Sequence, residues 1–255
     1  MIIDTHSHLN FKVFDNDRDE VIKRTQEQGV ICIDVGTKYE TSKRAVELAE
    51  KNDGIYAAIG LHPTETGEEF NYENYKKLAL SDSRRVVAIG EIGLDYYYKP
   101  KTKARLEQFK EKQKQVFLQQ LDLVRELDLP VIIHCRMAHQ NLIEILKSKN
   151  LIGAIHCFTG TLEEARQYIS LGFYIGLNGI IFKLDLDEII KKIPLDKILV
   201  ETDCPYLTPP AEGRDKRNEP IFVKYIVQKI ADLKETSFNE IAEATTQNAQ
   251  NLFKI

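Results

Sequence analysis

The stretch Pro130-Val131-Ile132-Ile133 is apolar throughout and runs directly into His134-Cys135. A strand without polar alternation is typical of a parallel sheet that is covered on both faces. Other short runs share its enrichment in Val, Ile or Tyr, and Gly, Pro, Asn or Asp bounds each of them. Together these runs predict eight strands: Ile2–His8, Val30–Val35, Ile55–Gly60, Val86–Gly93, Pro130–Cys135, Gly153–Phe158, Phe173–Leu177 and Ile198–Asp203.

Longer charged segments with the apolar spacing of amphipathic helices lie between the predicted strands. They are Asp17–Gln28, Glu40–Lys51, Tyr72–Ser81, Lys103–Asp128, Gln140–Lys149, Leu162–Leu171, Asp185–Lys192 and Pro220–Leu233, and a last helix is expected at Phe238–Phe253. Eight strands that alternate with eight helices are the count of an α/β protein of the TIM-type (β/α)8 barrel class.

The alternative architecture is a doubly wound open sheet, which usually has fewer strands and often carries a Gly-rich phosphate loop after the first one. Here the first strand ends in Asp4-Thr5-His6-Ser7-His8, which contains no glycine. The chain has 255 residues, close to the usual barrel size of about 250. No linker or repeat marks a domain boundary, so we expect residues 1–255 to form a single barrel domain.

The composition is that of an ordinary globular protein, with 43% hydrophobic and 29% charged residues, and it excludes a disordered chain. The 35 Lys and Arg residues and 39 Asp and Glu residues give a net charge of −4. This balance argues against a protein that coats nucleic acid through bulk positive charge. It is compatible with an enzyme that holds one phosphate in a small pocket.

The four cysteines form no CxxC pair, which favours free thiols in a reducing compartment. Strand alternation is expected to turn Cys135, Cys157 and Cys204 toward the helices. No basic and apolar signal precedes the first strand, and no apolar stretch approaches the roughly 18 residues of a membrane span. We therefore expect a cytoplasmic protein with no membrane partner.

Five of the six histidines lie within or just after predicted strands, namely His6, His8, His62, His134 and His156, whereas His139 falls at a helix start and is expected on the surface. The carboxyl ends of barrel strands meet at one rim, so these imidazoles converge there. His6 and His8 are two residues apart and point to the same side of a strand, as a clamp for a divalent metal ion would. The alternative is a chance pair on an exposed loop.

Two acids also end apolar strands: Glu91 in Ala88-Ile89-Gly90-Glu91 and Asp203 in Ile198-Leu199-Val200-Glu201-Thr202-Asp203. Burying an acid is costly unless it is paired or bound to metal. Glu91 is the candidate for a bridge between two ions, and Asp203 for a ligand that also takes a proton from the attacking water. The alternatives are a turn cap for Glu91 and a helix N-cap for Asp203.

The predicted metal ligands are therefore His6, His8, Glu91, His134, His156 and Asp203, with Glu91 and Asp203 as catalytic residues. This set provides enough ligands for two divalent ions. Imidazoles favour zinc, whereas carboxylates and a phosphate substrate suit magnesium or manganese, so the residue types leave the metal open among Mg, Mn and Zn.

Several other residues are candidates for binding substrate. Arg136 lies two residues beyond His134, and Arg214 and Arg217 lie in the loop after the last strand. A guanidinium group fits phosphate oxygens well, although a solvated basic loop is an equal alternative. Tyr96, Tyr97 and Tyr98 follow the strand of Glu91, and their rings, that of Tyr96 first, are candidates for stacking on a base or for simple packing. His62-Pro63 marks either a ligand or substrate contact or the end of a strand.

The motifs of this chain, taken together, resemble those of the TatD family of metal-dependent deoxyribonucleases in the amidohydrolase superfamily. The resemblance runs from residue 4 to residue 220 and is carried by Asp4-Thr5-His6-Ser7-His8, Gly60-Leu61-His62-Pro63, Gly90-Glu91-Ile92-Gly93-Leu94-Asp95-Tyr96, His134-Cys135-Arg136, His156-Cys157-Phe158-Thr159-Gly160, Glu201-Thr202-Asp203-Cys204-Pro205-Tyr206-Leu207 and Arg217-Asn218-Glu219-Pro220.

This resemblance implies a TIM-type barrel with two divalent ions. One ion would be held by the residues His6, His8, Glu91 and Asp203, and the other by Glu91, His134 and His156. It also implies a DNA phosphodiesterase of the 3′-to-5′ exodeoxyribonuclease type, which uses metal-activated water on single-stranded DNA or 3′ ends. Thr64 and Met137 depart from residues that are common in the family, and both are expected to affect substrate preference.

Two alternatives stay open. The same metal centre can attack a carbonyl, so an ester or amide hydrolase is possible, including a D-aminoacyl-tRNA deacylase with tRNA as its partner. A non-catalytic barrel that binds metal or nucleic acid belongs to a different class of protein.

Overall fold

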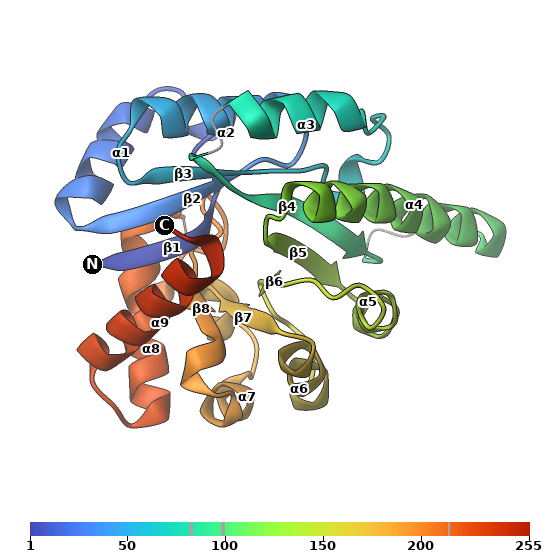
Figure 1. The fold of residues 1–255 in the computed structure, drawn as a ribbon. Helices are drawn as coiled ribbons and strands as arrows, with labels where there is room; N and C mark the ends of the chain where they lie inside the picture. The colour runs from blue at the N-terminus through green and yellow to red at the C-terminus, as the bar shows by residue number, and fades with distance from the viewer. Residues whose placement is uncertain (82–83, 98–99, 214) are drawn as a thin grey trace.

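The computed structural model describes residues 1–81, 84–97, 100–213 and 215–255 (Figure 1). In this part of the chain eight strands alternate with nine α-helices. The strands are β1 (Ile2–Ser7), β2 (Val30–Val35), β3 (Ile55–Ile59), β4 (Val86–Asp95), β5 (Val131–Arg136), β6 (Gly153–His156), β7 (Phe173–Leu177) and β8 (Ile198–Val200). The helices are α1 (Arg18–Glu27), α2 (Tyr39–Lys51), α3 (Tyr72–Ser81), α4 (Lys103–Leu127), α5 (His139–Leu146), α6 (Leu162–Ser170), α7 (Asp187–Lys192), α8 (Val223–Lys234) and α9 (Phe238–Phe253).

The strands form a parallel barrel. Each strand pairs with the next along the chain, in the order β1 to β8, and helices surround them (Figure 1). The last strand returns to the first, because the amide of Asp203 donates to the carbonyl of His6 at 2.8 Å and the amide of His8 donates to that of Cys204 at 2.9 Å. This closure confirms the predicted (β/α)8 architecture and excludes the open sheet.

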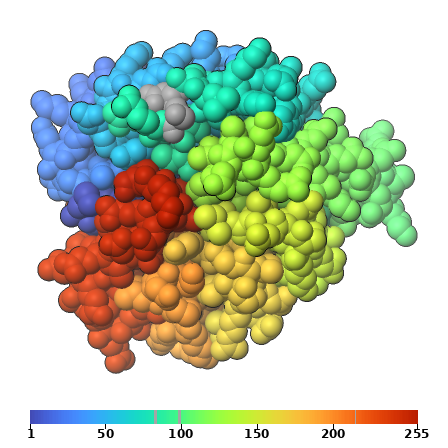
Figure 2. All heavy atoms as spheres, in the orientation of Figure 1, coloured from blue at the N-terminus to red at the C-terminus, as the bar shows by residue number. Residues whose placement is uncertain are grey.

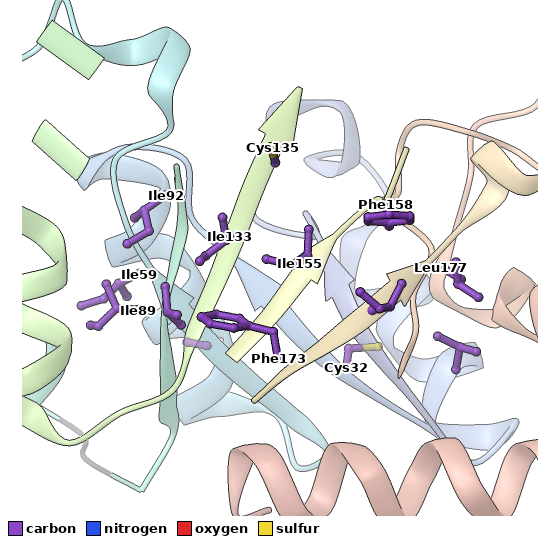
Figure 3. Close-up of a cluster of buried hydrophobic side chains, with 14 of the residues drawn as sticks. Cys32, Ile59, Ile89, Ile92, Ile133, Cys135, Ile155, Phe158, Phe173 and Leu177 are labelled. Atoms are coloured by element: carbon purple, nitrogen blue, oxygen red, sulfur yellow. The ribbon is translucent and has the colours of Figure 1, made fainter. Parts of the chain in front are cut away.

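An outer core lies between the strands and the helices. Ile133 and Ile155 of neighbouring strands are fully buried there, together with Phe158 and Phe173 (Figure 3). Helix residues such as Leu121 belong to the same cluster. Because side chains alternate along a strand, the residues that follow these isoleucines face the interior of the barrel.

An inner core fills one end of the barrel. Ile3, Ile33 and Leu199 come from three different strands and pack there against Leu252 and Phe253 of α9. In Figure 2 the atoms of α9 lie against those of the N-terminal segment on the face shown. None of the helices in the described ranges is long and apolar enough to cross a membrane.

A bulge in β1 changes which residues face inward. Ile3 belongs to the inner core, and His6, three residues later, lies 3.5 Å from Glu91 in the barrel interior. Regular alternation would place these two residues on opposite sides, but the pairing of β1 with β2 shifts between Asp4 and Ser7. Bulges of this kind re-aim side chains next to functional sites. The shift turns His6 to the interior.

A second shift in β4 does the same for Glu91. Ile89 and Ile92 both belong to the outer core although they are three residues apart, because the pairing with β5 shifts between them. The strands then approach closely at Gly93, whose φ is 143°. A Cβ atom at Gly93 would lie 2.1 Å from the carbonyl oxygen of His134, so glycine is required here.

We therefore expect the substitution Gly93→Ala to lower the free energy of unfolding by about 2–4 kcal/mol, because the backbone is both left-handed and crowded at this position. Urea unfolding followed by circular dichroism measures the change. Gly67→Ala is the matched control, since a Cβ atom there would meet nothing within 4 Å. Equal stability of the two variants would contradict this account of the β4–β5 contact.

Candidate metal centre

One carboxylate oxygen of Glu91 faces the histidine pair of β1. Its Oε2 lies 3.5 Å from His6 Nε2 and 3.9 Å from His8 Nε2. The two Nε2 atoms are 3.2 Å apart, and Asp203 Oδ1 lies 3.5 Å from that of His8. Two ligands about 2.1 Å from one ion are about 3.0–3.5 Å apart at tetrahedral or octahedral angles. The separations of 3.2 and 3.5 Å therefore fit a shared cation, and only the 3.9 Å between Glu91 and His8 is longer.

The other oxygen of Glu91 faces three more histidines. Oε1 lies 2.7 Å from His134 Nδ1 and 3.6 Å from the Nε2 atoms of both His62 and His156. Glu91 itself is only 4% exposed. The two oxygens thus divide the histidines into two groups, as a bridging carboxylate between two ions would.

The structure brings all six predicted ligands together, and His62 joins them. Ligand atoms within 4.8 Å of one another define four overlapping groups in the described part of the chain: His6 with His8 and Asp203, His6 with Glu91 and His156, His62 with Glu91 and His134, and His156 with Cys157 and Asp203. Because His6 and Glu91 each belong to two groups, the cluster is continuous.

Two further acids orient the histidines from behind. Asp95 Oδ2 lies 3.0 Å from His134 Nε2, and Glu201 Oε1 lies 2.8 Å from His156 Nδ1. Both acids are buried. Such outer partners fix the orientation of an imidazole and leave its other nitrogen available for a metal ion. On His8 the carbonyl of Val35 has this role, 2.7 Å from Nδ1.

The sequence analysis assigned no role to Asp95 or Glu201, although a signal existed. Glu201 lies two residues before Asp203, the spacing that already grouped His6 with His8. Asp95 ends an apolar strand, which is the criterion that selected Glu91. The same rules, applied to every acid near a strand end, would have included both residues.

The electrostatics of the cluster favour added positive charge. Burial would raise the pKa of Glu91, but the charge of His156 and the hydrogen bond from His134 oppose it, and the surrounding imidazoles hold that pKa well below its usual value. Burial would lower the pKa of His156, but Glu201 and Glu91 raise it to about 10. At His62, burial dominates and lowers the pKa to about 3. The ionised acids of the cluster stabilise positive charge, as the raised pKa of His156 shows. The same acids would stabilise a divalent cation, so the donor set fits a metal centre.

A cavity of about 760 Å³ opens above the cluster and is lined by residues that follow several strands. Its lining includes Glu91 and Asp203 together with apolar side chains that are unusually exposed, namely Tyr97 (48%), Met137 (63%), Leu184 (44%) and Tyr206 (56%). A polar floor with an apolar rim is typical of a ligand site.

Two of the predicted substrate-binding residues, His62 and Arg136, line this cavity. Tyr96 does not lie among the described lining residues, and its ring is buried. The amide of Tyr96 donates to the carbonyl of Arg136 at 2.9 Å, which extends the pairing of β4 with β5 by one residue. Because side chains alternate along a strand, the ring of the next residue, Tyr97, faces the cavity. The Arg136 guanidinium lies 3.6 Å from the centre of the Tyr97 ring. Of the three candidate tyrosines, Tyr97 is therefore the one that lines the cavity, whereas Tyr98 lies outside the described residues.

The predicted basic loop is only partly accounted for. Arg214 lies outside the described residues. Arg217 is not among the described residues that line the cavity. Its Nη1 and Nη2 donate to Asp17 at 2.8 and 2.6 Å, and Nη2 also donates to Glu219 at 3.2 Å. The structure therefore gives Arg217 carboxylate partners that tie the loop to the start of α1.

Two expectations about packing were wrong. His139 is buried instead of exposed, and its Nδ1 lies 3.0 Å from the hydroxyl of Tyr168. Cys157 lines the cavity instead of facing the helices, with Sγ within 4.8 Å of ligand atoms of His156 and Asp203. The strand ends at His156 and Cys157 has a φ of 46°, so alternation no longer applies there.

Comparisons with known proteins identify the family of this chain. The sequence model of the family described as TatD related DNase matches residues 3–254. The metal-dependent hydrolase YabD of Bacillus subtilis is 43% identical over 263 residues, which cover 100% of both chains. The 3′-5′ ssDNA/RNA exonuclease TatD of Cronobacter sakazakii is 35% identical over 264 residues, covering 99% of this chain and 97% of its own.

Among solved structures, the TatD homologue YJJV of Escherichia coli is similar with a TM-score of 0.90 at 33% identity, covering 100% of this chain and 98% of its own. These matches extend across the strands and loops that carry the clustered ligands, and they confirm the resemblance indicated by the motifs. The chain therefore belongs to the TatD-related DNase family and is a metal-dependent hydrolase.

Proposed function

We propose that this chain hydrolyses phosphodiester bonds at the 3′ end of single-stranded nucleic acid, with DNA as its main substrate. The observation that carries the proposal is the position of Glu91 between two groups of histidines, which suits a pair of divalent ions on either side of one phosphate. The relatives named 3′-5′ ssDNA/RNA exonuclease support the substrate and the polarity. We further propose that residues 1–255 act as one unit, and that the free cysteines reflect a reducing, cytoplasmic location.

Six residues would hold the ions: His6, His8, Glu91, His134, His156 and Asp203. Divalent ions bound there would lower the pKa of a water molecule and neutralise charge that develops on the phosphate. Magnesium and manganese suit the carboxylates and the phosphate, whereas zinc suits the imidazoles.

Asp203 is the residue that we propose as proton acceptor. Burial would raise the pKa of its carboxyl group, but the bond to His8 outweighs this and keeps the pKa below its usual value. The group is therefore ionised at neutral pH and able to accept a proton from the attacking water. As the water oxygen bonds to phosphorus, the bond from phosphorus to the 3′ oxygen of the preceding nucleotide breaks, and that oxygen takes up a proton.

Arg136 would orient the phosphate. It lines the cavity and is the last residue of β5, the strand that carries His134, and the Tyr97 ring supports its guanidinium group. A guanidinium fork donates two parallel bonds to phosphate oxygens, so it fixes the phosphorus relative to the ligands below.

The first test is digestion of a 5′-labelled single-stranded DNA with Mg²⁺ or Mn²⁺. We expect products that shorten from the 3′ end, and a fall in kcat/KM of about 10³-fold or more in Asp203→Asn, because that variant loses both a ligand and the proton acceptor. Asp196→Asn, at an exposed acid, is the control. Failure to release nucleotides under metal titration would reject the nuclease proposal, and turnover of D-aminoacyl-tRNA instead would replace it with the deacylase.

A second experiment measures metal content. In Glu91→Ala we expect elemental analysis to find less than half of the wild-type metal, because the two groups of histidines lose their shared carboxylate. The circular dichroism spectrum should stay unchanged, since packing holds the strands. Full metal occupancy in this variant would contradict the bridging role.

A third experiment addresses the acid behind His134. We expect Asp95→Asn to weaken metal binding by about 10–100-fold, because the amide no longer holds the imidazole with a negative charge. Isothermal titration with Mn²⁺ measures the affinity, and Asp122→Asn on the exposed face of α4 is the control. An unchanged affinity would show that Asp95 does not orient His134.

A further inference from the structure

A second cavity of about 790 Å³ borders the one above the metal centre. The two cavities share the residues Phe11, Thr37, Glu65 and Tyr206. The lining of the second cavity comes from the segments that follow β1, β2, β3 and β8. It therefore opens on the same rim of the barrel and continues the catalytic cavity sideways.

Positive charge gathers in this second cavity. Its lining contains Lys12, Lys38 and Arg44 against the acids Glu40 and Glu65, whereas the whole chain has a net charge of −4. The described lining thus has one cation more than acids, and Arg44 also lies 3.6 Å from Asp15, which is outside that lining. The ion pair of Lys38 with Glu68 is 3.4 Å long, and both side chains are well exposed. Such surface pairs contribute little to stability, so little free energy opposes a change of partner at Lys38.

We propose that this second cavity binds the backbone of the nucleic acid strand on the 5′ side of the scissile bond, while the terminal nucleoside occupies the catalytic cavity. This inference rests on the proposed function. Charge is distributed unevenly along the proposed substrate. The 3′-terminal nucleoside has no phosphate other than the scissile one, whereas every upstream nucleotide has a phosphate of its own.

The two cavities differ in charge, as do the two parts of the substrate. The catalytic cavity has an apolar rim that includes Met137 and Leu184, which suits a base without a further phosphate. The second cavity has Lys12, Lys38 and Arg44, which suit successive phosphates. If the upstream phosphates lie against the cations of the second cavity, the 3′ end of the strand points into the catalytic cavity.

Aromatic rings stand at the border between the cavities. The Phe11 ring stacks on the His8 ring, with centroids 4.4 Å apart and an interplanar angle of 9°. Tyr206 is 56% exposed, and its ring lies 6.4 Å from that of Phe11. Bases stack on exposed aromatic rings with little preference for sequence. The pair suits the base next to the scissile phosphate.

The loop that forms this border is held rigidly to the metal centre. Asn10 donates its side-chain amide to Asp34 Oδ1 and to the carbonyl of Val35, each at 2.9 Å. The same carbonyl of Val35 lies 2.7 Å from His8 Nδ1. Arg44 in turn donates to the carbonyl of Asn10 at 2.9 Å. The distance between the cationic cavity and the ligands is therefore fixed by the fold.

The test compares two substrates that differ only upstream of the scissile phosphate. One is a 5′-fluorescein-labelled strand of ten deoxythymidines, and the other is the p-nitrophenyl ester of thymidine 5′-monophosphate, which has no upstream nucleotide. In Lys12→Ala/Lys38→Ala we expect the ratio of kcat/KM for the strand to that for the ester to fall about tenfold, mainly through KM. The salt dependence of log kcat/KM for the strand should weaken by about one in slope.

Lys23→Ala/Lys43→Ala is the matched control, since both lysines are exposed and lie outside the cavity lining given by the described residues. It should leave the ratio and the salt slope unchanged. An unchanged ratio in Lys12→Ala/Lys38→Ala, or an equal loss on both substrates, would overturn the proposal, because neither result requires upstream binding.

Failure of the proposed function would be visible separately. If the wild-type protein hydrolyses neither substrate, fluorescence anisotropy of the labelled strand in EDTA decides the inference. A loss of affinity of about fivefold or more in Lys12→Ala/Lys38→Ala relative to the control would support strand binding in the second cavity, and equal affinities would reject it.

Discussion

The buried negative charge of Glu91 is the constraint on which the site depends. A lone carboxylate at 4% exposure would take up a proton instead of staying ionised. Here five imidazoles surround it, and the acids Asp95, Glu201 and Asp203 lie against three of those imidazoles. Glu91 thus lies at the centre, the imidazoles surround it, and the other acids lie outside the imidazoles. The negative charge of these acids is balanced only when the imidazoles are protonated or when metal ions bind. The arrangement makes the barrel mouth selective for cations before any substrate binds.

The sequence predicted the strands, the barrel and the convergence of the six candidate ligand residues, because apolar runs and polar strand ends are local patterns. It also predicted that His6 faces inward, but strand alternation alone does not explain this direction. Parity relates residues along an undisturbed strand, yet Ile3 and His6 both face inward despite their odd spacing, since a bulge lies between Asp4 and Ser7. Bulges depend on pairing with the neighbouring strand, so a single strand's sequence contains no reliable signal for them.

The errors in side-chain placement have the same origin. Tyr96 and Tyr97 are chemically equal. Which of the two rings lines the cavity depends on the backbone hydrogen bond from Tyr96 to Arg136, which extends the pairing of β4 with β5. Cys157 turns inward because its backbone is left-handed, a conformation that non-glycine residues adopt mainly where the surrounding structure imposes it. Arg217 finds its carboxylate partner Asp17 200 residues earlier in the chain. Such long-range pairs follow from the closed barrel and not from local pattern.

Closure of the barrel and alignment of the ligands depend on the same few atoms. Asp203 donates its amide to His6 across the seam between β8 and β1, while the Asp4 carboxylate accepts from the amide of His6 and from the amide and hydroxyl of Thr202. A cation held by His6, His8 and Asp203 would therefore join the first strand to the last. Because such an ion binds only the closed barrel, its affinity adds directly to the stability of the closed form. The residues that would bind the cation are thus also the residues at the seam where the ring of strands closes.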